Sequence, residues 1–176
     1  MNAIFFNQGQ VCTAGSRLFV HTSIYEQVIS ELSKAASNMK IGAGADPATE
    51  LGPLISPEQL ARVRHYIELG RSEGAVAVTG GQRPEREQFP GYFMQPTVFD
   101  KVHDQMTIAR EEIFGPVVVA LPFDTIEEVT TRANRSMYGL AAGVWTTDVK
   151  KAHEVSAALK AGVVWINTYN GFDSAA

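Results

Sequence analysis

The sequence predicts an α/β fold, in which a mainly parallel sheet carries helices on both faces. Strand-like segments alternate with helical segments of ten or more residues, and this order requires crossover connections between parallel strands. Hydrophobic residues make up 45% of the 176-residue chain, enough for a substantial core. No composition break, internal repeat or low-complexity tract divides the sequence. We therefore expect a single domain.

The first predicted elements are a strand and a helix. Residues 17–21 form a short apolar run that is typical of a buried strand. Thr22 or Ser23 is the expected cap of the following helix, because both can accept a hydrogen bond from a free amide of the first turn. Apolar residues recur at helical spacing from there to Met39, so the helix should present one apolar face to the sheet.

A second helix follows a loop rich in glycine and proline. Residues 41–55 form that loop. Ser56 and Pro57 indicate a helix start, since proline is well suited to the first helical position. The helix should run to about Glu73 and end at Gly74.

The remaining segments continue the alternation of strands and helices. A polar loop at 82–91 separates the strand-like residues 75–79 from an extended segment that begins at Phe93. The most hydrophobic strand candidate is 117–123. After it we expect, in order, a helix at 125–134, a strand at 141–145, a helix at 148–159 and a strand at 163–166. The two tryptophans, Trp145 and Trp165, fall in these strands and are expected in the core.

The single cysteine, Cys12, is the first candidate for chemistry. A lone cysteine is most often a small buried hydrophobic residue. Its polar neighbours make a poor core segment, because each would need a hydrogen-bond partner if buried: Gln8, Gln10, Thr13 and Ser16. Small residues at Gly9, Ala14 and Gly15 should leave backbone amides open, and such amides can hold a negatively charged oxygen. A reactive thiol is therefore the alternative to a buried one.

The totals exclude several classes of protein. A net charge of −4 indicates neither nucleic acid nor an acidic membrane surface as a partner. One cysteine allows no internal disulfide and fits a reducing compartment, so we expect a cytoplasmic location. The sequence contains no apolar run long enough for a membrane span and no signal peptide at its start. Both ends appear cut within larger elements, which predicts a piece of a longer protein.

A second candidate site lies a hundred residues after Cys12. Glu111 and Glu112 precede Phe114, and Gly115-Pro116 then forces a turn before the strand at 117–123. Ligands of parallel α/β sheets bind at strand ends and loops. A carboxylate can accept hydrogen bonds from ribose hydroxyls, and an aromatic ring can pack on a flat ring. The alternative is that both acids face solvent and Phe114 belongs to the core.

Six stretches in this order resemble the aldehyde dehydrogenase superfamily, over nearly the whole chain. The stretches are Gln8-Gly9-Gln10-Val11-Cys12, Gly52-Pro53-Leu54-Ile55, Gly91-Tyr92-Phe93 with Gln95-Pro96-Thr97, Glu112-Ile113-Phe114-Gly115-Pro116, Tyr138-Gly139-Leu140-Ala141-Ala142 and Trp165-Ile166-Asn167-Thr168-Tyr169. The resemblance implies the catalytic-domain fold of that family, truncated at both ends. It also implies oxidation of a small-molecule aldehyde to a carboxylic acid with NAD or NADP.

The resemblance assigns roles to individual residues. Cys12 would be the nucleophile, forming a thiohemiacetal and then a thioester, with its own amide helping to hold the oxyanion. Glu112 would bind the nicotinamide ribose, and Phe114 would pack near the nicotinamide. Gln59 falls where the family has a cofactor-facing side chain.

Three residues fall where the family lines its substrate tunnel: Val11, Thr13 and Phe172. Asn167 resembles a structural residue near the site. The ending Asn167-Thr168-Tyr169-Asn170 resembles family members that act on aromatic aldehydes such as phenylacetaldehyde.

Other parts of the family pattern are missing. The sequence contains no G-x-G-x-x-G, since Gly42-Ala43-Gly44 lacks the third glycine. In the family, the dinucleotide-binding domain, the general base and an oxyanion-binding asparagine lie upstream of the cysteine. The segment used for oligomerisation lies downstream. We therefore expect residues 1–176 to be a partial catalytic domain, inactive alone, from a protein that forms homo-oligomers.

Other readings remain open. The four histidines lack metal-ligand spacing, so no metal site is expected. Spacing alone leaves open a Cys-His hydrolase pair, because such partners need not be near each other in sequence. A cysteine-dependent esterase or acyl transferase is an alternative, since the thioester step needs no nicotinamide. A non-catalytic binding module with the same fold is another.

Overall fold

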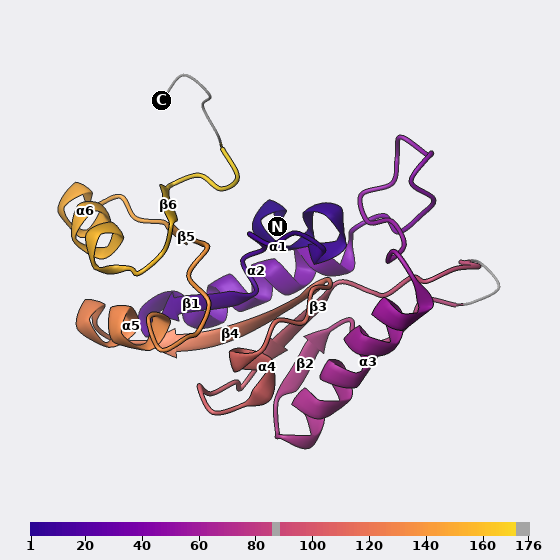
Figure 1. The fold of residues 1–176 in the computed structure, drawn as a ribbon, viewed down its shortest axis with the longest axis horizontal. Helices are drawn as coiled ribbons and strands as arrows, with labels where there is room; N and C mark the ends of the chain where they lie inside the picture. Colours follow the sequence, from indigo (N-terminus) through magenta and orange to yellow (C-terminus); the bar gives the residue numbers. More distant parts are fainter. Residues whose placement is uncertain (86–88, 172–176) are drawn as a thin grey trace.

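A computed structural model describes residues 1–85 and 89–171 of the chain (Figure 1). The strands are β1 (Arg17–His21), β2 (Val76–Thr79), β3 (Thr97–Asp100), β4 (Val117–Phe123), β5 (Ala141–Val144) and β6 (Val163–Ile166). The α-helices are α1 (Asn2–Phe5), α2 (Tyr25–Ser37), α3 (Pro57–Ser72), α4 (Thr107–Arg110), α5 (Ile126–Ala133) and α6 (Val149–Ala158). There are also two 3₁₀ helices. The first, η1 (Phe6–Gly9), precedes the loop that contains Cys12, and the second, η2 (Thr22–Ile24), precedes α2.

The described strands form one four-stranded sheet and one two-stranded sheet. The larger sheet has the order β1-β4-β3-β2. Strand β4 pairs in parallel with β1, with Arg17 opposite Val119, and in parallel with β3, with Thr97 opposite Val117. Only the edge strand β2 is antiparallel. The smaller sheet pairs β5 and β6 in parallel. The mainly parallel α/β prediction is confirmed, although the strands divide between two sheets rather than one.

Strand β4 is an inner strand of the larger sheet, between β1 and β3. Its side chains pack against different helices on the two faces of the sheet. Successive side chains of a strand point to opposite faces of the sheet. Val117, Val119 and Leu121 pack in the core cluster that contains residues of α3 and α4. Val118 and Ala120 pack on the other face, in clusters that contain residues of α1 and α2. Figure 1 shows α2 and α3 on opposite sides of the sheet, as predicted.

Side-chain caps explain where most of the longer helices begin. Ser56 accepts from the amide of Gln59 at the start of α3, as its position before Pro57 predicted. Thr125 and Asp148 cap α5 and α6 in the same way. The predicted cap of α2 is wrong. The chain first makes η2, His21 accepts from the Ser23 amide, and no side chain caps α2 itself.

Several short elements escaped prediction, and one tryptophan was misplaced. Helices α1 and α4 have four residues each, too few to produce a clear helical period in the sequence. Strand β3 lies after the extended segment expected from Phe93 and was not identified as a strand. Trp165 is buried as expected, but Trp145 is 57% exposed. Trp145 follows the last residue of β5, so its ring is not enclosed by the strand pair.

The C-terminal unit of β5, α6 and β6 is joined to the main sheet through α5. The guanidinium of Arg17, in β1, donates to the carbonyl of Ala133 at 2.9 Å. The next residue, Asn134, donates to the carbonyl of Ala158 and accepts from the amide of Lys160. These bonds connect the strand that follows Cys12 to the end of α6, and so hold the C-terminal unit beside the Cys12 segment.

Candidate active site

Cys12 lies on an exposed turn between η1 and β1. The backbone leading to it is unusual, because Asn7, Gln8 and Gly9 have φ values of 48°, 58° and 68°. Left-handed backbone is uncommon for residues other than glycine and is frequent at functional sites. The three residues turn the chain sharply, so the thiol is presented at the surface instead of entering the core. Of the two alternatives, a buried cysteine and an accessible thiol, the structure shows the accessible one.

The Cys12 segment and the turn before β4 touch through two glycines. A Cβ atom at Gly9 would lie 2.1 Å from the carbonyl oxygen of Gly115, so only a residue without a side chain allows this approach. Gly115 is equally confined on its other side, where a Cβ would lie 2.4 Å from Val63 Cγ2, in α3. The two stretches that stood out in the sequence are therefore neighbours in space.

The two glutamines that flank Gly9 hold the loop before α3. Gln10 Oε1 accepts from the amide of Ile55 at 3.0 Å. In the orientation that satisfies both ends of its amide, Gln8 accepts from the amide of Gly52 at 3.1 Å. The polar character of the Cys12 segment thus has a structural use in addition to any chemical one. Three separate stretches of the sequence converge at this point.

The segment after β6 reaches the other side of the Cys12 turn. The hydroxyl of Tyr169 donates to the carbonyl of Thr13 at 2.7 Å, and the hydroxyl of Thr13 donates to Asn170 Oδ1 at 2.9 Å. The ring of Tyr169 packs against Trp165 and stacks on Trp145, with ring centroids 4.7 and 5.9 Å away. Burial raises the pKa of Tyr169, so its hydroxyl keeps the proton that it donates.

Two side chains of the turn before β4 face outward, while those on either side of them are held. Glu111 accepts from the hydroxyl of Tyr66 at 2.7 Å, and Ile113 is buried. Glu112 is exposed, and Phe114 is 36% exposed. The expectation that Phe114 could be a core residue is therefore not met. A carboxylate and an aromatic ring are presented together, as a ribose and a flat ring would require.

Gln59 takes part in this turn in a way that the sequence did not indicate. Its side-chain amide donates to the carbonyl of Phe114 at 2.6 Å and more weakly to that of Ile113 at 3.3 Å. The side chain was expected to face a cofactor. Its amide nitrogen donates to the backbone of the turn that carries Glu112 and Phe114, and its role toward a cofactor stays a prediction.

The amides around Cys12 only partly match the expectation of open donors. The amide of Ala14 donates to Val11, and that of Gly15 donates to Ala3, so neither is available to a ligand. This part of the prediction is wrong, because the turn closes on itself and on α1. Within the described residues, the amide of Cys12 donates no backbone hydrogen bond. This amide is therefore open to a ligand beside the thiol.

The remaining predicted site residues fall into three groups. Val11 and Thr13 flank the thiol and are half-buried. Phe172 lies outside the described residues. Asn167 lies beyond β6, where its amide donates to and accepts from the backbone of Thr146 at 2.9 Å. Tyr169, which holds the Cys12 turn, was quoted only as part of a motif. A tyrosine in the polar segment directly after a strand is the signal that could have identified it, because a partly buried tyrosine hydroxyl usually finds a hydrogen-bond partner.

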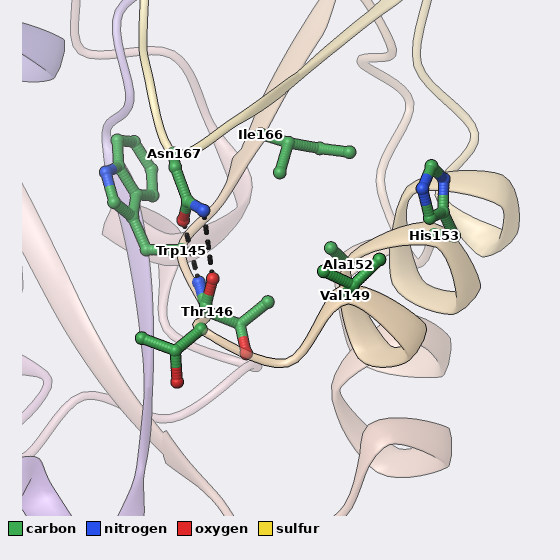
Figure 2. Close-up of a pocket in the computed structure, with 8 residues that line it drawn as sticks. Trp145, Thr146, Val149, Ala152, His153, Ile166 and Asn167 are labelled. Carbon is green, nitrogen blue, oxygen red and sulfur yellow. Dashed lines mark hydrogen bonds between the residues drawn. The ribbon is translucent and has the colours of Figure 1, made fainter.

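A hollow of 460 Å³ lies beside the C-terminal strand pair, apart from Cys12 and Glu112. Figure 2 shows its lining, with Trp145 and the paired bonds of Asn167 and Thr146 on one side and His153 of α6 on the other. Asn167 fixes the end of β6 next to the end of β5, which supports the structural role expected of it. The hollow contains no pair of groups suited to the predicted chemistry.

Two further findings concern the described part of the chain. No helix there is long and apolar enough to cross a membrane. No group of three or more histidine, cysteine, aspartate or glutamate side chains is gathered there in a way that could hold a metal ion.

Comparison with known proteins identifies many similar chains. The model of the aldehyde dehydrogenase family matches residues 1–176. The betaine aldehyde dehydrogenase of Bacillus subtilis (strain 168) is 46% identical over 173 residues, which are 98% of this chain and 35% of that protein. An NAD⁺ complex of an aldehyde dehydrogenase from Bacillus cereus is 56% identical, with a TM-score of 0.95 over 99% of this chain and 35% of that one.

A structure of the betaine aldehyde dehydrogenase from Staphylococcus aureus, a P449M point mutant in complex with NAD⁺ and with a BME-modified cysteine, is 40% identical to this chain. Its TM-score is 0.97 over 99% of this chain and 36% of that one. The chain thus spans about a third of the length of the proteins that it matches.

Proposed function

The chain belongs to the aldehyde dehydrogenase family, and from this premise we propose that it supplies the nucleophile and part of the cofactor site of an NAD(P)-dependent aldehyde dehydrogenase. One observation carries the proposal: the exposed Cys12 turn is joined by the Gly9–Gly115 approach to the turn that presents Glu112 and Phe114. A thiol is thereby brought near the groups suited to a nicotinamide ribose.

Cys12 acts as the covalent catalyst. Its thiolate adds to the aldehyde carbon, and the carbonyl π electrons move to the oxygen to form a thiohemiacetal oxyanion. Loss of the aldehyde hydrogen as hydride re-forms the C=O bond and leaves a thioester on the sulfur. Water then attacks the thioester carbon, the C–S bond breaks, and a carboxylate, the thiolate and two protons are released. Capture on sulfur divides one difficult oxidation into two easier steps.

The backbone and neighbours of Cys12 stabilise the charge that develops. The Cys12 amide, which makes no backbone hydrogen bond to another described residue, is available to the oxyanion. Tyr169 and Asn170 hold the following residue, Thr13, and so support the turn that carries that amide. Val11 and Thr13 line the path of the aldehyde, and Phe172 is proposed to complete it.

Glu112 and Phe114 fit the nicotinamide half of a dinucleotide. The exposed carboxylate of Glu112 can accept from the two ribose hydroxyls, and the half-exposed ring of Phe114 can pack beside a flat ring. When bound, NAD or NADP accepts the hydride. The NAD⁺ complexes of the Bacillus cereus and Staphylococcus aureus relatives support this assignment, and the modified cysteine of the latter supports a reactive thiol in this family.

The rest of the enzyme lies outside these residues. We propose that 1–176 form a partial catalytic domain, with the dinucleotide-binding domain, the general base and the oligomerisation segment of a homo-oligomeric enzyme supplied elsewhere. The single cysteine, which has no partner for a disulfide, supports a reducing compartment such as the cytoplasm. Relatives named for betaine aldehyde support a small aldehyde as substrate, and the Asn167–Asn170 motif favours an aromatic one.

The test uses a hybrid enzyme, in which residues 1–176 replace the matching 35% of the Bacillus cereus aldehyde dehydrogenase. The hybrid enzyme should form NADH from NAD⁺ and phenylacetaldehyde or betaine aldehyde, and Cys12→Ala should lower kcat by about 10³-fold or more. Ser72→Ala, which removes a hydroxyl at the far end of α3, is the control and should have no effect. An active Cys12→Ala variant refutes the nucleophile assignment.

Assays of the isolated chain distinguish the proposed function from the alternative functions. It should form no NADH, since it lacks the groups expected upstream of Cys12. Ester hydrolysis by the chain alone, without NAD⁺ and dependent on Cys12, would favour a cysteine esterase. Substantial NADH formation by the chain alone would show that the partial-domain assignment is wrong.

A further inference from the structure

Two side chains of α3 donate hydrogen bonds to the backbone of the turn that carries Glu112 and Phe114. Arg62 donates through Nε to the carbonyl of Ile113 at 3.3 Å and through Nη2 to the carbonyl of Glu112. Gln59, one helical turn earlier, donates to the carbonyls of Ile113 and Phe114. Three consecutive carbonyls, at residues 112–114, are thus held by two side chains of one helix.

Arg62 is itself held in place. Its guanidinium lies over the ring of Tyr66, 4.9 Å from the ring centroid, and Nη2 is 3.3 Å from the Tyr66 hydroxyl. Tyr66 is buried and donates to Glu111 at 2.7 Å. Burial first, and then this hydrogen bond, raise the pKa of Tyr66, so the hydroxyl stays protonated at neutral pH. The planar fork of an arginine is suited to hold two carbonyls at once.

The turn needs this support because its backbone is strained. Phe114 has a φ of 58°, a left-handed conformation that is costly for an aromatic residue. The amide of Glu112 lies 3.3 Å from the hydroxyl of Tyr138. Without donors on the carbonyl side, the peptide groups of residues 112–114 are free to rotate toward ordinary values, and such rotation would redirect the Glu112 and Phe114 side chains.

We propose that Arg62 is a positioning residue for the cofactor, and that Gln59 shares this role through the carbonyls that it holds. The proposal rests on the function proposed above for Glu112 and Phe114. Arg62 touches neither Cys12 nor the reacting atoms. It fixes the backbone from which the ribose-binding carboxylate and the nicotinamide-facing ring project. Loss of Arg62 should therefore weaken cofactor binding and leave the chemistry at Cys12 intact.

The first test measures the turn itself in the 176-residue chain by amide hydrogen exchange. Arg62→Met should accelerate exchange of the Glu111 and Glu112 amides by about tenfold, the ratio expected for one net hydrogen bond. Arg64→Met, an exposed arginine of the same helix, is the control and should have no effect. Unchanged exchange in Arg62→Met overturns the proposal, and so does equal acceleration throughout β4, which would indicate a general loss of stability.

The second test measures steady-state kinetics in the hybrid enzyme. Arg62→Met should raise the KM for NAD⁺ by about tenfold and leave kcat within about twofold, the pattern of lost binding without lost chemistry. Arg62→Lys, which keeps the charge but not the fork, should restore part of the affinity. An unchanged KM for NAD⁺, or a fall in kcat that lysine does not restore, overturns the positioning role. Failure of the proposed function has a different signature, namely activity that survives Cys12→Ala.

Discussion

Replacing Gly9 with alanine should break the contact on which the proposed site depends. The added Cβ would lie 2.1 Å from the oxygen and 2.5 Å from the carbon of the Gly115 carbonyl, and both are backbone atoms that cannot rotate away. Gly9 also has a φ of 68°, which an alanine adopts only with strain. The substitution therefore imposes two separate costs, one local to residue 9 and one between the two turns.

The two costs can be worked out and separated. A left-handed φ costs a residue with a side chain roughly 1–2 kcal/mol. Overpacking against fixed atoms costs a further ~1–3 kcal/mol. Gly9→Ala should thus lower the free energy of unfolding by about 2–5 kcal/mol, a large part of the ~5–15 kcal/mol typical of a domain. Gly74→Ala is the matched control, because Gly74 has a φ of 99° but open space around its Cβ position.

Urea unfolding of the three chains measures both effects. Gly74→Ala should lose about 1–2 kcal/mol, and Gly9→Ala clearly more. In the hybrid enzyme, Gly9→Ala should also lower kcat/KM by about 10²-fold, since a displacement of about 1 Å is enough for such a loss. Gly74→Ala should leave activity unchanged. If Gly9→Ala loses no more stability than Gly74→Ala and retains full activity, the two turns do not depend on their contact.

Three other changes test the surroundings of the site. Tyr169→Phe removes the hydrogen bond to the Thr13 carbonyl, so it should lower the free energy of unfolding in urea by about 1 kcal/mol. It should also lower kcat in the hybrid enzyme. If neither quantity changes, Tyr169 does not support the Cys12 turn. Ser56→Ala removes the cap of α3 and should cost about 1 kcal/mol without altering the KM for NAD⁺, whereas an altered KM would tie the helix start to cofactor binding. Arg132→Met should make the free energy of unfolding fall less steeply as the pH is lowered into the acid range. The bond from the Asp124 amide, and then Arg132, hold the pKa of Glu128 below its ordinary value, so its contribution is present above about pH 4.3 and is lost as pH falls through the lower folded pKa. Equal acid slopes in unfolding experiments would contradict that role of Arg132.

Much of the fold could be predicted because its elements carry local signals. The apolar run of β4 and the Ser56-Pro57 start of α3 are read directly from neighbouring residues. The cap by His21 could not be predicted, because it depends on a 3₁₀ turn that forms before α2. The exposure of Trp145 depends on how far the strand pair of β5 and β6 extends, and residue preferences do not determine this.

The candidate site was only partly predictable for a similar reason. Cys12 and Glu112 were identified as separate stretches, and resemblance rather than spacing related them. Their contact depends on two glycines a hundred residues apart, Gly9 and Gly115, and neither glycine alone indicates a partner. The use of Gln59 on the backbone of the turn is likewise a property of helix placement, which brings a side chain of α3 to carbonyls more than fifty residues away.

The most direct measurement of the central claim is mass spectrometry of the hybrid enzyme, quenched in acid during turnover with phenylacetaldehyde and NAD⁺. A thioester on sulfur survives acid, so the peptide that contains Cys12 should carry the mass of the phenylacetyl group. Omission of NAD⁺ should abolish this adduct, because the thioester forms only after hydride has left. Steady turnover with the Cys12 peptide unmodified, and the acyl group on another residue, would contradict the assignment of Cys12 as the nucleophile.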